Sequence, residues 1–246
     1  SEMNKKLRTF VYPVCAFIVL LLLWQVCVML STSEIAFPTP VAVFKEFFYI
    51  LTHKVGNYYT VVGHVLWSLS RVLVGFSIAA VFGIILGLTM GWFDYVRAVM
   101  MPIFNLLRPI APLAWIPLAI LWFGIGEKYK YFLIFIAAFV PFTLNAFAGA
   151  SHVDKQLVGA ARMLGASKSQ LFFEIVVPAA VPSIFSGAQV ALSNSWMTML
   201  AAEMVCATEG AGWIIIAGQS VNDMTQMIAG MLAIGIVGLL LAIGMR

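Results

Sequence analysis

The sequence is poor in charged residues, and this absence argues against an ordinary soluble domain. Asp, Glu, Lys and Arg make up only 10% of its 246 residues, against about 25% in an average chain. Hydrophobic residues reach 63%, and the mean hydropathy is +1.02. We therefore expect an all-α integral membrane protein, because helices satisfy their own backbone hydrogen bonds inside a lipid bilayer.

Residues that build disulfides, metal centres and catalytic sites are also few. The three cysteines lie in apolar runs without C-x-x-C spacing, and the three histidines lie far apart. This argues against a disulfide framework, a metal cluster and a membrane-embedded enzyme. The basic residues behind the net charge of +4 do not gather on one face, which argues against a nucleic-acid partner.

A phosphate-binding loop is missing as well. Such a loop requires two glycines separated by four residues and followed by Lys and then Ser or Thr. Here five residues separate Gly159 from Gly165, and Ala166, Ser167 and Lys168 follow. We infer that the chain does not hydrolyse ATP by itself.

Six apolar segments are present, each long enough for a membrane helix of about 20 residues. We expect one transmembrane domain over residues 1–246, with spans at 11–30, 63–90, 98–123, 131–150, 183–207 and 226–246, and a loop at 151–182. The first apolar run exceeds the usual 7–15 residues of a signal-peptide core, so it is predicted to be an uncleaved span.

The positions of Lys and Arg predict the orientation, because these residues collect on cytoplasmic loops. Placing both termini in the cytoplasm gives eight inside (Lys5, Lys6, Arg8, Arg97, Lys155, Arg162, Lys168, Arg246) against four outside (Lys45, Lys54, Lys128, Lys130). The loop at 151–182 is then cytoplasmic and the segment 31–62 is external. A helix starting at the prolines of PTPVAVFKEFFYIL is expected either on the outer membrane surface or packed on the protein.

Two apolar segments carry unusual small residues and prolines. Small residues at every fourth position of the second span predict a helix–helix seam, within one subunit or between two: Gly75, Ala79, Gly83, Gly87 and Gly91. The third span contains Pro102, Pro109, Pro112 and Pro117, which predict either a broken helix lining a transport path or a kinked packing helix.

The cytoplasmic loop predicts two short helices joined by a glycine turn. Ser151 with Asp154, and Ser167 with Gln170, have the spacing of capping boxes that start helices. Gly165 lies where a left-handed residue ends the first helix. The second helix is expected to end before Pro178. The stripe of Leu157, Ala161 and Leu164 suits a groove on a partner protein.

This loop resembles the EAA loop of ABC importer permeases, whose pattern is Glu-Ala-Ala, three residues, Gly, nine residues, Ile, any residue, Leu-Pro. Ala160, Ala161, Gly165, Ile175 and Pro178 match, whereas Gly159 replaces the Glu and Val177 the Leu. Nearly the whole chain is similar to the nitrate, sulfonate, taurine and bicarbonate branch, through RPIAPLAWIPLAILWFGIG (108–126), GASKSQ (165–170), WMTMLAAEM (196–204) and EGAGWII (209–215).

The resemblance implies a type I importer permease fold in a bacterial cytoplasmic membrane. It implies an ATPase in two copies that binds ATP and Mg, a second permease subunit that makes a homodimer or a heterodimer, and an extracytoplasmic binding protein. The residues implied to couple to the ATPase are Gly159, Ala160, Ala161, Arg162, Leu164, Gly165, Ala166 and Ser167. No cofactor is expected on this chain itself.

Several polar or aromatic residues in the spans are candidates for the path or its gate: Arg108, Trp115, Asn194, Trp196, Thr198 and Glu203. Ionisable residues inside membranes are costly and often functional. Arg108 is expected to attract an anion or to reach the headgroups, and Glu203 to form a gate or to be satisfied structurally. Asn194 and Thr198 are expected either to line a path or to form hydrogen bonds between helices. Arg71 is expected to be an anchor or a member of an ion pair.

The sequence thus predicts the permease subunit of an ATP-driven importer for a small solute, with anions such as a sulfonate, taurine, nitrate or bicarbonate favoured. Permeases for thiamine-precursor pyrimidines and other small organic solutes share the same motifs. An ATP-independent secondary transporter is the other alternative, and it would require coupling-ion ligands or a polar pore. Few ionisable residues lie in the spans, which disfavours it.

Overall fold

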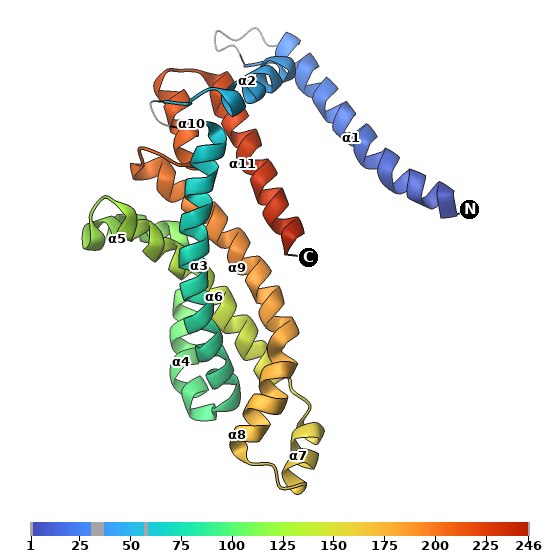
Figure 1. The fold of residues 1–246 in the computed structure, drawn as a ribbon, viewed down its shortest axis with the longest axis vertical. Helices are drawn as coiled ribbons and strands as arrows, with labels where there is room; N and C mark the ends of the chain where they lie inside the picture. The colour runs from blue at the N-terminus through green and yellow to red at the C-terminus, as the bar shows by residue number, and fades with distance from the viewer. Residues whose placement is uncertain (1, 31–36, 57–58, 246) are drawn as a thin grey trace. The chain divides into compact units, whose positions relative to one another are not determined.

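The computed structural model describes residues 2–30, 37–56 and 59–245, and these are helical apart from turns and one isolated bridge between Val55 and Tyr59 (Figure 1). Parts of the expected external segment, 31–36 and 57–58, lie outside the described residues, as does Arg246. The helices are α1 (Glu2–Leu30), α2 (Pro40–Thr52), α3 (Val61–Trp92), α4 (Asp94–Leu107), α5 (Ile116–Phe123), α6 (Glu127–Ser151), α7 (Lys155–Met163), α8 (Lys168–Gln170), α9 (Val177–Cys206), α10 (Ala211–Ser220) and α11 (Met224–Gly244).

The described helices make an all-α membrane protein with four or five candidate spans. Helix α3, helix α6, the helical run containing α9, and α11 are long and apolar enough to cross a bilayer. A fifth span results if α4 and the following helical pair are taken together. The apolar part of α1, Val14–Leu30, is shorter than these four helices. Six spans therefore stay a prediction.

The chain divides into two compact units, and each is described by itself. The first unit comprises Ser1–Val62 and Ile214–Ala233. In it, the Thr39 hydroxyl accepts a hydrogen bond from the Ala42 amide at 3.3 Å and Pro40 begins α2, as the prolines predicted. Val43 and Ile50 are buried, whereas Phe44 and Phe48 are exposed. Helix α2 thus keeps an apolar face uncovered within the chain.

The second unit, Gly63–Trp213 with Ile234–Arg246, contains the predicted small-residue seam. A Cβ atom on Gly75 would lie 2.6 Å from Ile134, and one on Gly83 would lie 2.8 Å from Phe142. On Gly87 it would lie 2.6 Å from the Ala146 Cβ. The small residues therefore bring α3 against α6 of the same chain, and the seam lies within one subunit.

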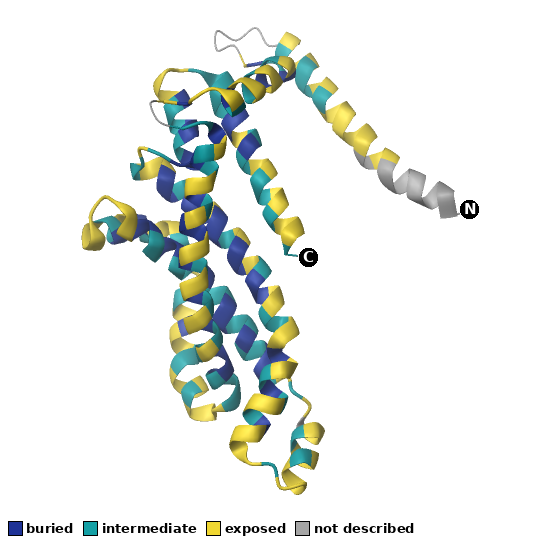
Figure 2. Ribbon diagram, in the orientation of Figure 1, coloured by how far each residue is buried: buried dark blue, intermediate teal, exposed yellow. Residues whose placement is uncertain are grey.

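Helices α6 and α9 pack along each other in the second unit, and their buried side chains form much of its core (Figure 2). Gly149 and Gly187 allow this approach. A Cβ on Gly149 would lie 2.9 Å from the Ala180 Cα, and one on Gly187 would lie 2.6 Å from the Asn145 Cβ. The close approach of α6 and α9 therefore depends on a glycine from each helix.

The prolines of the third predicted span do break the helix. Helix α4 ends at Leu107, a 3₁₀ turn runs over Pro112–Trp115, and α5 follows at an angle of 86° to α4. Pro102 is tolerated inside α4. The break places Arg108 and Trp115 at the corner between the two helical segments, which is where the cavity described below opens.

One helix end was predicted wrongly. The helix starting at Lys168 was expected to end before Pro178, but it runs on through a π-helical segment, Leu171–Val176, into α9. Pro178 has no amide hydrogen to donate along this continuous helix, and the π-helical segment lies directly before it. In this π-helical segment the backbone hydrogen bonds join residues five apart rather than four. The helix therefore continues through Pro178 instead of ending before it.

Candidate functional site

The helix–turn–helix at 151–182 has the predicted glycine stop. Gly165 has a φ of +89°, in the left-handed region. The Gly165 amide donates to the Arg162 carbonyl and the Ala166 amide to the Ala161 carbonyl, both at 3.1 Å. These two bonds form a Schellman motif, which satisfies the last carbonyls of α7. The angle between α7 and the next helix is therefore fixed by one residue that tolerates this backbone.

The second predicted capping box is confirmed and the first is wrong. The Gln170 amide donates to the Ser167 hydroxyl at 3.3 Å, and the Ser167 amide donates to the Gln170 side chain at 2.9 Å. Ser151, by contrast, is the last residue of α6, and its hydroxyl donates back to the Phe147 carbonyl at 2.8 Å. Asp154 alone caps α7, by accepting from the Gln156 amide at 2.8 Å.

The turn presents apolar side chains that nothing in the chain covers. Leu164 is 89% exposed and Met163 is 86% exposed. Leu157 is exposed too, whereas Leu171 and Val176 after the turn are buried. A Cβ on Gly159 or on Gly165 would meet no atom within 4 Å. The second helix of this helix–turn–helix is thus packed on the protein, whereas α7 and the Gly165 turn are exposed. Figure 1 shows α7 beside the start of the helical run that leads into α9.

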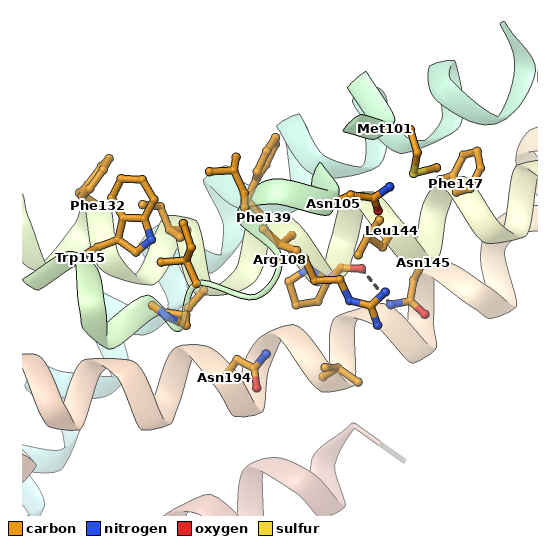
Figure 3. Close-up of a pocket in the computed structure, with 18 residues that line it drawn as sticks. Met101, Asn105, Arg108, Trp115, Phe132, Phe139, Leu144, Asn145, Phe147 and Asn194 are labelled. Carbon is orange, nitrogen blue, oxygen red and sulfur yellow. Dashed lines mark hydrogen bonds between the residues drawn. The ribbon is translucent and has the colours of Figure 1, made fainter. Parts of the chain in front are cut away.

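A cavity of about 730 Å³ lies at the corner of α4, between α4, α6 and α9 (Figure 3). Three of the predicted path residues line it together: Arg108, Trp115 and Asn194. Arg108 follows the last turn of α4, and Trp115 ends the 3₁₀ turn, with its ring packed edge-on to Phe132 at 6.5 Å between centroids. Most of the remaining lining is aliphatic or aromatic.

Two further amides in this cavity were not predicted, Asn105 on α4 and Asn145 on α6. The Asn145 side-chain amide donates to the Pro141 carbonyl at 2.9 Å, one turn earlier on α6 (Figure 3). The available signal was that polar side chains in apolar segments usually face the protein interior or a cavity rather than lipid.

The other predicted path residues lie elsewhere. Trp196 lines a second cavity of about 520 Å³ beside Gly238 and Met245, and Asn194 borders both cavities. Thr198 and Glu203 line neither cavity and are buried. The structure therefore brings Arg108, Trp115 and Asn194 together and separates Thr198 and Glu203 from them.

Glu203 lies in a buried cluster of charges around Arg71. The Arg71 guanidinium, 1% exposed, pairs with Glu203 at 3.2 Å and with Glu209 at 2.9 Å, and it forms two bonds to Glu127, one of them at 2.8 Å. Lys130 adds a bond to Glu127 at 2.8 Å. The cluster joins α3, the start of α6, the end of α9 and the loop after it. Arg71 is thus an ion-pair member, one of the two roles predicted for it.

Neutral donors complete the cluster around Glu203. The Ser68 hydroxyl donates to Oε1 of Glu203 at 2.6 Å, and the Gly212 amide donates to Oε2 at 2.9 Å. The Ser68 hydroxyl oxygen accepts from the Ala211 amide at 2.9 Å. A Cβ on Gly210, whose φ is +122°, would overlap the Glu203 carboxylate. Only glycine therefore fits where this loop crosses the carboxylate.

The carboxylates of the cluster form ion pairs with Arg71 and Lys130. In the described part of the chain, no group of three or more His, Cys, Asp or Glu is placed to hold a metal ion. The partners Glu127, Glu209 and Lys130 were missed as a site. The available signal was that ionisable groups beside apolar helices require opposite charges nearby.

The sequence of this chain is similar to those of known transport proteins. Residues 79–246 match the family described as binding-protein-dependent transport system inner membrane component. The taurine transport system permease protein TauC of Escherichia coli (strain K12) is 34% identical over 91% of this chain and 81% of its own length. The nitrate import permease protein NrtB of Synechocystis sp. is 39% identical over 93% and 84%. The bicarbonate transport system permease protein CmpB of Synechococcus elongatus is 34% identical over 98% and 88%.

A solved structure shares the fold. A chain of the MetNI methionine ABC transporter, in a structure of inward-facing conformations, aligns with a TM-score of 0.65 and 18% identity. The alignment covers 75% of this chain and 93% of that chain.

Proposed function

The chain belongs to the permease subunits of binding-protein-dependent ABC transporters, and we propose that it forms the path for a small anion in an importer whose ATPase docks on α7 and the Gly165 turn. ATP binds to that separate ATPase subunit and not to this chain. The relatives carry taurine, nitrate and bicarbonate in their names. We take such small oxyanion-bearing solutes as the substrate class.

The observation that carries the proposal is the exposed, rigidly capped α7. Its turn exposes Leu164 and Met163, and burying such side chains fully stabilises an interface by about 1.5–3 kcal/mol each. The Schellman motif and the Ser167 capping box hold the turn, so a push on α7 is passed to α9 without bending at Gly165. A rigid apolar helix is what a groove on a moving partner requires.

The proposed placement in the membrane follows the basic residues. With both termini in the cytoplasm, the helix–turn–helix faces the ATPase, and α1 supplies the first of six spans. The loops around 31–62, 124–130 and 208–225 would then meet the binding protein outside. The family's single coupling loop per chain supports two permease copies, as a homodimer, with two ATPase subunits.

The proposed mechanism is alternating access. ATP draws the two ATPases together, α7 moves with them, and α9 transmits that movement to the cavity of Arg108 and Asn194. The Arg71 cluster ties the far end of α9 to α3 and α6, so movement of α9 strains or breaks its ion pairs. Glu203 acts in this proposal as a latch on the path and not as a ligand for the anion.

Replacing Gly165 tests the coupling. Gly165→Asp places a side chain at a φ of +89°, which strains the turn and changes the angle of α7. We expect ATP-driven uptake of taurine, nitrate or bicarbonate to fall several-fold while the protein still inserts. The control is Gly235→Ala on α11, because a Cβ there also meets no atom within 4 Å and the residue is helical and outside the coupling loop. Uptake in Gly165→Asp equal to the control would contradict the proposed coupling.

A further inference from the structure

We propose that the cavity at the corner of α4 is an oxyanion-binding site in the permease itself, with the Arg108 guanidinium as its charge and the side-chain amides of Asn105 and Asn194 as neutral donors. The inference rests on the proposed function and deepens it. It assigns part of the recognition of the solute to this chain rather than to the binding protein alone.

The charge of the cavity points to an anion. Arg108 is the one ionisable residue among its 18 lining residues, and no carboxylate is among them. A cation would therefore find no compensating charge in this cavity, whereas a monovalent anionic group would find one. Arg108 is exposed, so its charge is accessible to a solute that enters the cavity.

Arg108 is free to bind, unlike two other arginines of the same unit. Arg71 is surrounded by three glutamates, and Arg97 on α4 pairs with Asp94 at 2.8 Å. Among the described contacts, the Arg108 side chain forms no ion pair and no hydrogen bond, and only its backbone amide bonds to the Phe104 carbonyl. Its planar fork of donors is thus available for a bidentate bond to two oxygens.

Neutral donors reach the same cavity from separate helices. Asn105 lies one turn before Arg108 on α4, and Asn194 lies on α9. The described contacts give neither side chain a hydrogen-bond partner. In Figure 3 the Arg108 side chain extends toward Asn145 of α6, and Asn194 lies on the neighbouring helix. An anion between them would be bound by groups from the α4 corner and from α9, the helix that transmits the movement in the proposed transport cycle.

The chemistry fits a group with three oxygens around one central atom. Sulfonate, nitrate and bicarbonate share this form, so two oxygens can face the Arg108 fork while the third is left for a neutral donor of the cavity wall. Trp115 and Phe132, which are half-buried, form part of the aromatic wall nearby. At about 730 Å³ the cavity exceeds what one such group fills, which suits a weak site that must release its ligand.

The direct test measures binding without transport. The complex of permease and ATPase, purified without a binding protein, is titrated with sodium nitrate and with taurine at constant ionic strength, and its melting temperature is followed. Ligand that binds only the folded state raises that temperature in a saturable way. The variants are Arg108→Gln and Arg108→Lys, with Arg97→Gln as the control on the same helix.

We expect a saturable rise in the wild type and in Arg97→Gln, a half-saturating concentration at least about tenfold higher in Arg108→Gln, and an intermediate value in Arg108→Lys. Asn194→Ala should weaken binding as well. No saturable rise in the wild type, or the same titration in Arg108→Gln, overturns the proposal.

A lipid phosphate shares this chemistry, and a second arm separates it from a soluble anion. The same variants are compared in nanodiscs with and without phosphatidylglycerol. An Arg108-dependent stabilisation by phosphatidylglycerol alone, with no response to nitrate or taurine, assigns the cavity to lipid and overturns the proposal.

Uptake by the assembled importer distinguishes this inference from the proposed function. Normal ATP-driven uptake in Arg108→Gln, at the substrate concentration that half-saturates the wild type, refutes the site and leaves the importer standing. Arg108-dependent binding without any ATP-driven uptake in the wild type supports the site and refutes the proposed coupling.

Discussion

Replacing Arg71 by Met removes a buried guanidinium that three glutamates face, and it tests whether the cluster holds the helices together. Met has a similar length and no charge, so the change removes the ion pairs with little loss of volume. The partners then differ in their access to water. Glu127 is 47% exposed and Glu209 is 30% exposed, whereas the Glu203 side chain is fully buried.

The magnitude follows from these exposures. Glu127 keeps its bond to Lys130, and both it and Glu209 regain water, so their loss is small. Glu203 keeps the Ser68 and Gly212 donors and the attraction of Lys130, but it loses its one ion-pair partner among the described contacts. Removing one partner of a buried pair costs about 3–5 kcal/mol. We expect the lower end, about 3 kcal/mol, because two donors remain at Glu203.

The assay is the free energy of unfolding in detergent, by denaturant titration of the purified protein. Arg97→Met is the matched control, since Arg97 also pairs with a carboxylate at 2.8 Å but both side chains are largely exposed. It should cost about 0–1 kcal/mol. The double variant Arg71→Met with Glu203→Gln removes the stranded charge and should recover at least about 1 kcal/mol. Equal costs for Arg71→Met and Arg97→Met would refute the reasoning.

Two further predictions concern packing and capping. Gly87→Ala places a Cβ 2.6 Å from Ala146, so α3 and α6 must separate; it should cost about 1–3 kcal/mol of unfolding free energy, whereas Gly235→Ala, where a Cβ meets no atom within 4 Å, should not. Ser167→Ala removes the cap of the helix after the Gly165 turn and should cost about 1 kcal/mol locally, seen as faster amide hydrogen exchange at Gln170. Ser169→Ala is its control, and equal exchange in both would count against the capping argument.

Local features of the fold could be predicted because the residues responsible are close in sequence. The left-handed Gly165, the Ser167 capping box and the start of α2 at Pro40 each depend on a few neighbouring residues. The seam of α3 was also predictable, since one small residue per turn marks a face against which another helix packs closely. Its partner α6 was not, because spacing along one helix does not identify the helix that packs on it.

The remaining features depend on contacts between distant residues. Arg71 and Glu127 are 56 positions apart, and only the packing of α3 on α6 brings them together. The π-helical segment before Pro178 reflects a tertiary environment that overrides the local preference of proline to end a helix. Ser151 fits a capping box by spacing, yet α6 extends through it, because its hydroxyl bonds back to the helix.

The sequence predicted which kinds of residue line the candidate path, but it predicted only in part which of them lie together. Arg108, Trp115 and Asn194 do line one cavity, but they come from the corner after α4 and from α9. Thr198 lies one helical turn beyond Asn194 and is buried instead. The proline break, which turns the chain by 86°, decides which side chains reach the cavity, and its angle has no sequence signal.

The central claim is that this chain works only with a separate ATPase, and the composition of its native complex tests this most directly. The complex is purified through this chain in mild detergent from its native host, and its mass is measured by native mass spectrometry. The account predicts two copies of this chain with two ATPase subunits. A chain that purifies reproducibly without any ATPase, and still transports in liposomes, would contradict it.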